Sequence, residues 1–145
     1  MSKLHITAEM PTASLDGGAD VVVLVVSGEI DYESCPLLRM SILSQIGAGK
    51  RRLVIHLSAV EFIDSMAIGV LVGTVARLRA SGGGSLVVVC AAENKRVLRT
   101  FNVAGVANAI SLYRSREEAL RALVAAWMIE LPPAVEPYFS RFAPA

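Results

Sequence analysis

Asp64 and Ser65 are the residues of this chain whose types and spacing best suit chemistry. They stand in the stretch VEFIDSMAIGVL (60–71), between a strand-like apolar run and a helix-like one. A serine at such a junction can serve as a helix N-cap, as a catalytic nucleophile or as an acceptor of phosphate. The residues around it help to separate these three roles.

Catalysis by Ser65 lacks the partners that it would need. The nucleophile elbow G-x-S-x-G is absent, because Ile63 and Ala67 stand at the two glycine positions. A serine nucleophile also needs a base within hydrogen-bond reach, and His56 is a lone histidine inside a β-branched run. A hydrolase that used Ser65 would therefore need a base that the sequence does not show, and we expect no enzyme activity.

The sequence indicates neither a phosphate-binding loop nor a metal site. SGGGS (81–85) follows a helix-like run and precedes a strand-like one, the reverse of a phosphate-binding loop, and no lysine stands near its end. A zinc site needs about four ligands, and the histidines and cysteines are scattered at His5, Cys35, His56 and Cys90. We expect no cofactor, no metal and two buried, reduced thiols, with a redox pair left open.

The helix predicted from Ser65 to about Ala80 has an unusual outer face. Its inner arc collects apolar residues that should face a sheet, namely Ala67, Ile68, Leu71, Val72, Val75, Ala76 and Leu78. Its outer arc consists of Met66, Gly69, Val70, Gly73, Thr74 and Arg77. Each mid-helix glycine costs about 1 kcal/mol relative to alanine. We infer that the outer arc is covered, either by another part of this chain, such as its tail, or by a second protein.

Phosphorylation of Ser65 is compatible with a folded helix. A phosphate adds about −1.5 to −2 charges, which the free N–H groups and positive dipole end of a first turn tolerate. Asp31 and Asp64 each follow a predicted strand, so we expect them to lie close together. A phosphate would place charge and bulk beside the apolar outer arc, repelling an acidic partner surface and penalising a dry interface.

The rest of the sequence predicts the elements that position these residues. Strands are expected at 3–9, 21–28, 51–60, 86–91 and 107–113, and helices from a Ser34 cap to Gly47 and at 65–80, 93–106 and 115–128. This alternation implies an α/β sheet that is largely parallel. Ser115 and Glu118 form a candidate capping box. We assign 1–128 to one domain and 129–145 to a Pro-rich C-terminal tail.

Composition narrows the choice of partners. The net charge is +1, which argues against a surface that neutralises many phosphates, so nucleic acid is not expected. Apolar residues occur in runs far shorter than the roughly 18 to 20 that cross a bilayer, and the N-terminal residues MSKLHITAEMP contain no apolar signal core. We expect a cytoplasmic protein with no membrane contact.

Three segments together resemble a known family. They are VVSGEID (25–31), LVIHLSAVEFIDSMAIGVLVG (53–73) and GGGSLVVVCAAENKRVLRTFNVAGV (82–106). In order and spacing they are similar to STAS domains, and the branch they resemble most is the bacterial anti-sigma-factor antagonists, whose familiar members act in sporulation and general stress. The resemblance covers roughly residues 4 to 127.

The resemblance implies a four- to five-stranded mixed sheet with helices mainly on one side, and no catalysis. It implies an unphosphorylated antagonist that binds an anti-sigma factor with serine-kinase activity, thereby releasing a sigma factor and regulating transcription. The kinase then phosphorylates the antagonist and breaks the complex, and a PP2C-type phosphatase restores it. By position, Ser65 matches the phosphoacceptor, Asp64 the preceding aspartate and Asp31 an acidic position near the kinase contact.

The chain departs from the family pattern after Ser65. Met66 and Ala67 replace a small hydroxyl residue and a glycine, which bears on kinase efficiency and partner choice. Our expected partner-binding residues are Asp31, Asp64, Met66, Gly69, Val70 and Gly73. Two other roles stay open besides the hydrolase: a scaffold subunit of a stressosome-like or lipid-transport assembly, and a module that binds a small ligand or nucleotide. A homodimer also stays open.

Overall fold

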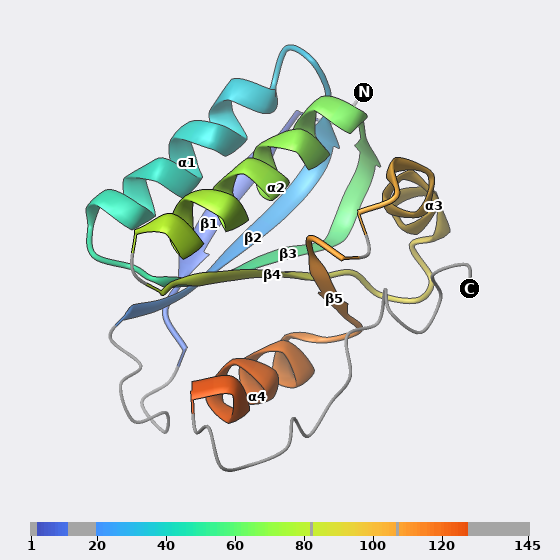
Figure 1. The fold of residues 1–145 in the computed structure, drawn as a ribbon. Helices are drawn as coiled ribbons and strands as arrows, with labels where there is room; N and C mark the ends of the chain where they lie inside the picture. Colours follow the sequence, from blue (N-terminus) through green and yellow to red (C-terminus); the bar gives the residue numbers. More distant parts are fainter. Residues whose placement is uncertain (1–2, 12–19, 82, 107, 128–145) are drawn as a thin grey trace.

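A computed structural model describes residues 3–11, 20–81, 83–106 and 108–127 (Figure 1). Five strands are present in this part: β1 (His5–Glu9), β2 (Val21–Ile30), β3 (Arg52–Ile63), β4 (Ser85–Val89) and β5 (Ser111–Tyr113). The helices are α1 (Cys35–Gly47), α2 (Ser65–Ala80), α3 (Lys95–Ala104) and α4 (Arg116–Trp127). The predicted Pro-rich tail, 129–145, lies outside the described residues.

The strands form one mixed sheet in the order β1-β2-β3-β4-β5. Strands β2 to β5 are parallel neighbours, whereas β1 pairs antiparallel with β2 at the edge. The β-branched runs of β2, β3 and β4 are buried, as expected for parallel strands covered on both faces. The predicted mixed α/β sheet is therefore confirmed.

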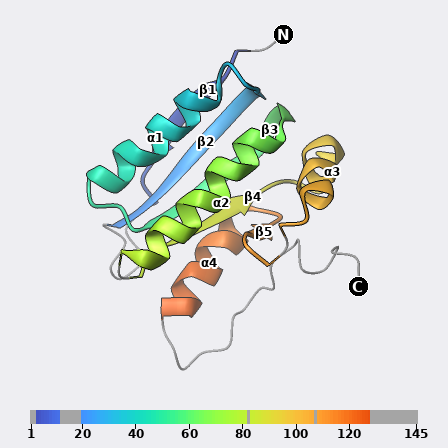
Figure 2. The same ribbon diagram turned by 45° about the horizontal axis from the view of Figure 1, so that its top comes forward.

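The helices cover the two faces of the sheet unequally. Helices α1, α2 and α3 pack on one face over a core that includes Leu24, Leu53, Leu71 and Phe101. Of the described helices, α4 is the one that packs on the other face, against a smaller cluster around Val54 and Val89. Figures 1 and 2 both show α1 and α2 side by side above β2 and β3, with α4 beneath the sheet. The expectation of helices mainly on one side is confirmed.

Each strand differs from its predicted range by at least one residue, and the largest differences are in β3 and β5. Strand β3 continues past Val60 to Ile63, because β2 still pairs with it after β4 has ended at Val89. The Asn94 side chain donates from Nδ2 to the Val60 carbonyl over 2.7 Å and so satisfies part of the open edge. Strand β5 is confined to 111–113, which pair with Val87–Val89 of β4.

The capping predictions are borne out in part. Ser115 Oγ accepts a hydrogen bond from the Glu118 N–H over 3.2 Å, as a capping serine should. The Glu118 carboxylate, however, accepts from the Arg114 N–H over 3.4 Å and not from Ser115, so the box is not reciprocal. Cys35 and Cys90 are both buried and free, as predicted. Within the described residues, no helix combines the length and apolarity that crossing a membrane requires.

Candidate functional site

Helix α2 begins at the carboxyl end of β3, and Asp64 caps it. The Asp64 backbone is extended, and its Oδ1 accepts a hydrogen bond from the Ala67 N–H over 3.0 Å. Ser65 is the first helical residue, exposed, and no hydrogen bond joins its hydroxyl to a residue that the structure describes. The interpretation of Ser65 as the N-cap is therefore wrong. The Asp64 carboxylate caps the helix, and the Ser65 hydroxyl is left uncommitted.

The structure places Asp31 and Asp64 at adjacent strand ends. Each directly follows one of two register partners, Ile30 of β2 and Ile63 of β3. The Asp64 N–H also donates to the Ile30 carbonyl over 3.1 Å, which ties the two strand ends together. The expected proximity of the two aspartates follows from parallel pairing, since parallel strands end at the same edge of a sheet.

Asp31 is held by a compact loop between β2 and α1. Its Oδ1 accepts from the backbone N–H groups of Glu33 and Ser34 and from the Ser34 hydroxyl, each over 3.0 Å. The Ser34 N–H, then the Ser34 hydroxyl and the Glu33 N–H, hold the pKa of Asp31 below its usual value. Ser34 occupies the cap position of α1, but its hydroxyl serves Asp31 instead of the helix. The motif D-x-x-S was the local signal for this arrangement.

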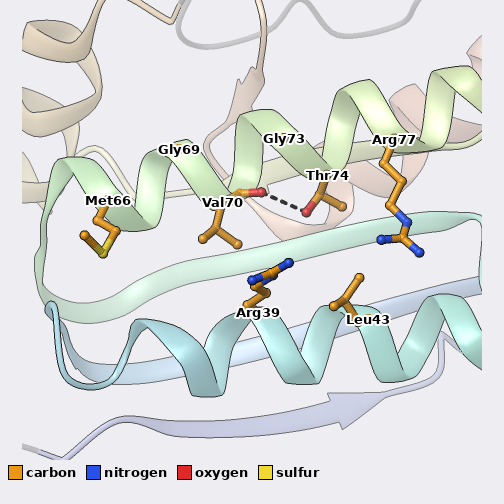
Figure 3. A pocket seen from close by; sticks show the side chains of 8 residues that line it. All are labelled: Arg39, Leu43, Met66, Gly69, Val70, Gly73, Thr74 and Arg77. Carbon is orange, nitrogen blue, oxygen red and sulfur yellow. Dashed lines mark hydrogen bonds between the residues drawn. The ribbon is translucent and has the colours of Figure 1, made fainter.

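A groove of about 400 Å³ runs between α1 and α2. Figure 3 shows Arg39 and Leu43 reaching into it from α1, opposite side chains of α2. Its α2 side comprises four of the expected partner-binding residues together with two others: Met66, Gly69, Val70, Gly73, Thr74 and Arg77. Arg39 and Leu43 were not predicted as site residues, because nothing local in the sequence brings α1 beside this part of α2.

The buried side of α2 differs in part from the one that the sequence predicts. Thr74, assigned to the outer arc, is buried and donates from Oγ1 to the Val70 carbonyl over 2.8 Å. Ala76, assigned to the inner arc, is exposed. The reason is that α1 packs along one flank of α2, so the buried arc includes that flank as well as the side facing the sheet.

The two glycines of the outer arc border open space. A Cβ atom added at Gly69 or Gly73 would meet nothing within 4 Å. Met66, one turn before Gly69, is 50% exposed. The described part of the chain therefore leaves Met66, Gly69 and Gly73 of the outer arc uncovered. The tail, which was one of the two predicted covers, lies outside the described residues.

His56 lies on the opposite face of the sheet from Ser65. The charges that act on its pKa belong to Arg116, Glu117 and Glu9, on the α4 side, while burial is the main cause that lowers it. Its Nε2 is 3.1 Å from the Ser58 hydroxyl. Because α2 packs on the other face, His56 is not placed to act as a base for Ser65. Among the described residues, no three His, Cys, Asp or Glu side chains gather into a metal site.

Comparison with known proteins places these features in a family. The STAS-domain family model matches residues 12–119. The anti-sigma-B factor antagonist of Bacillus subtilis (strain 168) is 35% identical over 96 residues, which cover 63% of this chain and 81% of that protein. A crystal structure of an anti-sigma factor antagonist from Mycobacterium paratuberculosis matches with a TM-score of 0.63 at 28% identity, covering 81% and 92% of the two chains.

A further structural likeness supports the fold alone. The structure of SpoIIAA, an anti-sigma factor antagonist, in its unphosphorylated form matches with a TM-score of 0.64 at 22% identity. The match covers 82% of this chain and 96% of the other. The fold predicted from the three sequence segments is therefore confirmed.

Proposed function

This chain belongs to the STAS-domain family, and on that basis we propose that it is an anti-sigma factor antagonist switched off by phosphorylation of Ser65. In its unphosphorylated form it binds an anti-sigma factor with serine-kinase activity and so releases a sigma factor. A PP2C-type phosphatase removes the phosphate and restores binding. The chain acts in the cytoplasm as a regulator of transcription and not as an enzyme.

The observation that carries this proposal is the state of Ser65. Its hydroxyl is exposed and uncommitted, because Asp64 caps the helix in its place. A kinase can reach such a hydroxyl without unfolding α2. The N–H groups of the first turn and the helix dipole then accommodate the added charge, so the domain stays folded in both states.

The surroundings of Ser65 explain how a phosphate would break a complex. Asp64 is adjacent in sequence, and Asp31 follows the neighbouring strand end. A phosphate there adds to two existing negative charges and would repel acidic groups of the partner, because like charges that face each other across an interface cost several kcal/mol. Met66, Gly69, Val70 and Gly73 extend from the same end of α2 as an uncharged contact surface.

A scaffold subunit without a phosphoswitch is the second candidate, and Met66 favours it. This side chain is half-exposed and stands directly after Ser65, where it adds bulk beside the acceptor hydroxyl. If that bulk keeps a kinase away, the same surface could still hold a partner permanently, as in a stressosome-like or lipid-transport assembly.

Binding of variants at Ser65 tests the switch. The purified chain is incubated with ATP, Mg²⁺ and each anti-sigma factor encoded by the same genome, and phosphate is located by mass spectrometry. We expect one phosphate on Ser65, absent in Ser65→Ala. Calorimetry should show that Ser65→Ala binds like the wild type, while Ser65→Asp binds at least about tenfold more weakly. Ser81→Asp, at the other end of α2, is the matched control and should bind normally.

The outcomes separate the two candidates. Equal binding by Ser65→Ala and Ser65→Asp would rule out the switch. A chain that gains no phosphate from any of these kinases, yet co-purifies with subunits of a larger assembly, would support the scaffold. In either case Gly73→Glu should abolish partner binding without lowering the unfolding temperature, because position 73 faces open space.

A further inference from the structure

The charges of the domain are separated between its helices and its strand ends. The three helices on one face contain only basic charged residues: Arg39 in α1, Arg77 and Arg79 in α2, and Lys95, Arg96 and Arg99 in α3. Acidic residues cluster instead where β2 and β3 end, at Glu29, Asp31, Glu33, Glu61 and Asp64. The net charge of +1 therefore conceals a basic helical face beside an acidic edge.

Two of these basic residues line the groove between α1 and α2. Arg39 enters it from α1 and Arg77 from α2, and none of the described acidic side chains lines it (Figure 3). The ion pairs that join described residues, Arg52–Asp20 and Arg116–Glu9, involve neither guanidinium. Both arginines are exposed, so the groove presents positive charge that the described part of the chain does not balance.

The shape of the groove suits a helix. From Met66 to Arg77 the α2 side extends roughly 17 Å at 1.5 Å per residue, which is the length of about three helical turns. Gly69 and Gly73 are one turn apart and have open space above them, so a second backbone can approach closely there. Leu43 and Val70 add apolar surface to the same groove.

We infer that this groove binds an acidic amphipathic helix of the anti-sigma factor, whose carboxylates pair with Arg39 and Arg77 while small apolar residues pack on Gly69 and Gly73. The inference rests on the proposed function and specifies the part of the partner that the chain recognises. Charge complementarity selects an acidic occupant over a neutral or basic one.

A phosphate on Ser65 would also repel an acidic occupant of the groove. Ser65 lies one turn before Gly69, about 6 Å along the helix axis. That separation is shorter than the Debye length of about 8 Å at physiological salt, so a phosphate on Ser65 would repel carboxylates seated in the nearer part of the groove. Phosphorylation would thus act on the occupant of the groove as well as on the acidic edge.

Charge reversal in the groove tests this inference. The full chain carrying both Arg39→Glu and Arg77→Glu is titrated with the anti-sigma factor that binds the wild type. We expect its affinity to fall by roughly tenfold or more. Arg79→Glu is the matched control, because Arg79 is an exposed arginine of the same helix that does not line the groove; it should bind within a factor of about two or three. Thermal unfolding checks that all variants are folded.

Hydrogen exchange of the complex identifies the occupant. We expect protection of groove amides in α1 and α2 and, on the anti-sigma factor, of one acidic helix. Substituting lysines for its acids should restore binding to the Arg39→Glu, Arg77→Glu chain. Wild-type affinity of the doubly reversed chain, or protection of a neutral or basic segment instead, would overturn the inference while leaving the proposed function intact.

Other occupants of the groove give different results. Glu130 and Glu136 are the acidic residues of the C-terminal tail. If Glu130→Ala and Glu136→Ala in the full chain speed hydrogen exchange of the groove amides in the absence of any partner, then the tail fills the groove. If the chain sediments as a dimer that the double reversal dissociates, then a second copy fills it. Either result overturns the inference. Failure of the wild-type chain to bind any anti-sigma factor would instead refute the proposed function itself.

Discussion

Asp64, rather than Ser65, holds the first turn of α2, and this division of roles matters for function. Its carboxylate bonds to the Ala67 N–H, while the Ser65 hydroxyl is left exposed. Had Ser65 been the cap, phosphorylation would have removed a structural hydrogen bond. With an aspartate cap, the stability of α2 and the chemistry of the acceptor are carried by different residues.

The cap can be tested by substitution. Asp64→Ala should lower the free energy of unfolding by about 1 kcal/mol, because the Ala67 N–H loses its acceptor. Asp64→Asn keeps a capping oxygen and should cost less. Ser65→Ala should change stability by only a few tenths of a kcal/mol, as usual for an exposed side chain without special contacts. Urea denaturation measures all three, and a larger loss in Ser65→Ala than in Asp64→Ala would contradict the assignment.

Asp31 gives the domain a pH-dependent contribution to stability. Hydrogen bonds from the Ser34 N–H and hydroxyl hold its pKa below the value of about 3.9 in an unfolded chain. Such a group stabilises the fold above that pH, and its contribution is lost as the pH falls through the folded pKa. The wild type should therefore have a higher free energy of unfolding than Asp31→Asn at pH 7, and this difference should be smaller at pH 3. A difference that is the same at both would contradict this account.

At the scale of elements, α2 keeps two glycines that its own packing does not require. Among the described residues, neither Gly69 nor Gly73 has a neighbour that a Cβ would strike, and neither has a positive φ. By contrast, Gly105 ends α3 in the left-handed conformation, with a φ of +67°, which side chains rarely adopt. The glycines of α2 are thus explained better by close approach of a partner than by the fold.

Alanine substitutions distinguish these two kinds of glycine. Gly69→Ala and Gly73→Ala should each raise the free energy of unfolding by up to about 1 kcal/mol, since alanine favours the helix. Gly105→Ala should lower it by about 1 kcal/mol, because of the strain at positive φ. Chemical denaturation gives the values. Destabilisation by Gly69→Ala or Gly73→Ala would mean that a further segment of the chain packs over α2.

At the scale of the whole molecule, the separation of charge orients the domain toward a partner. Basic helices beside an acidic edge form a charge pattern that steers encounter even though the net charge is small. The partner surface that fits this pattern is acidic where it meets the basic helices. Mismatched orientations would bring like charges together, so the pattern favours one way of docking.

Association kinetics test this steering. The association rate constant with the anti-sigma factor should fall several-fold between low and physiological salt. Arg99→Glu, on the exposed side of α3, should slow association at low salt with little effect on dissociation. Arg121→Glu, on α4 at the opposite face of the sheet, is the matched control and should leave both rates unchanged. Stopped-flow measurement gives the rate constants. Equal effects of Arg99→Glu and Arg121→Glu on the association rate constant would count against steering.

The sequence alone determined the order of elements, the sheet class, the family and the candidate acceptor. These follow from local patterns: short β-branched runs such as 21–26 favour buried strands, and Asp64-Ser65 stands at the junction between a strand-like run and a helix-like one. Local patterns did not show where β3 ends, since Glu61 interrupts the apolar run and only pairing with β2 extends the strand to Ile63.

Tertiary structure alone decided what surrounds the acceptor. It assigned the cap to Asp64 through an extended backbone at that residue, and it placed Asp31 beside it through the register of two strands. It also buried Thr74 and brought Arg39 and Leu43 to α2, which no pattern within α2 could indicate. The physical reason is that periodicity reports which side of a helix is apolar, whereas the neighbour on each side is chosen by the packing of elements distant in sequence.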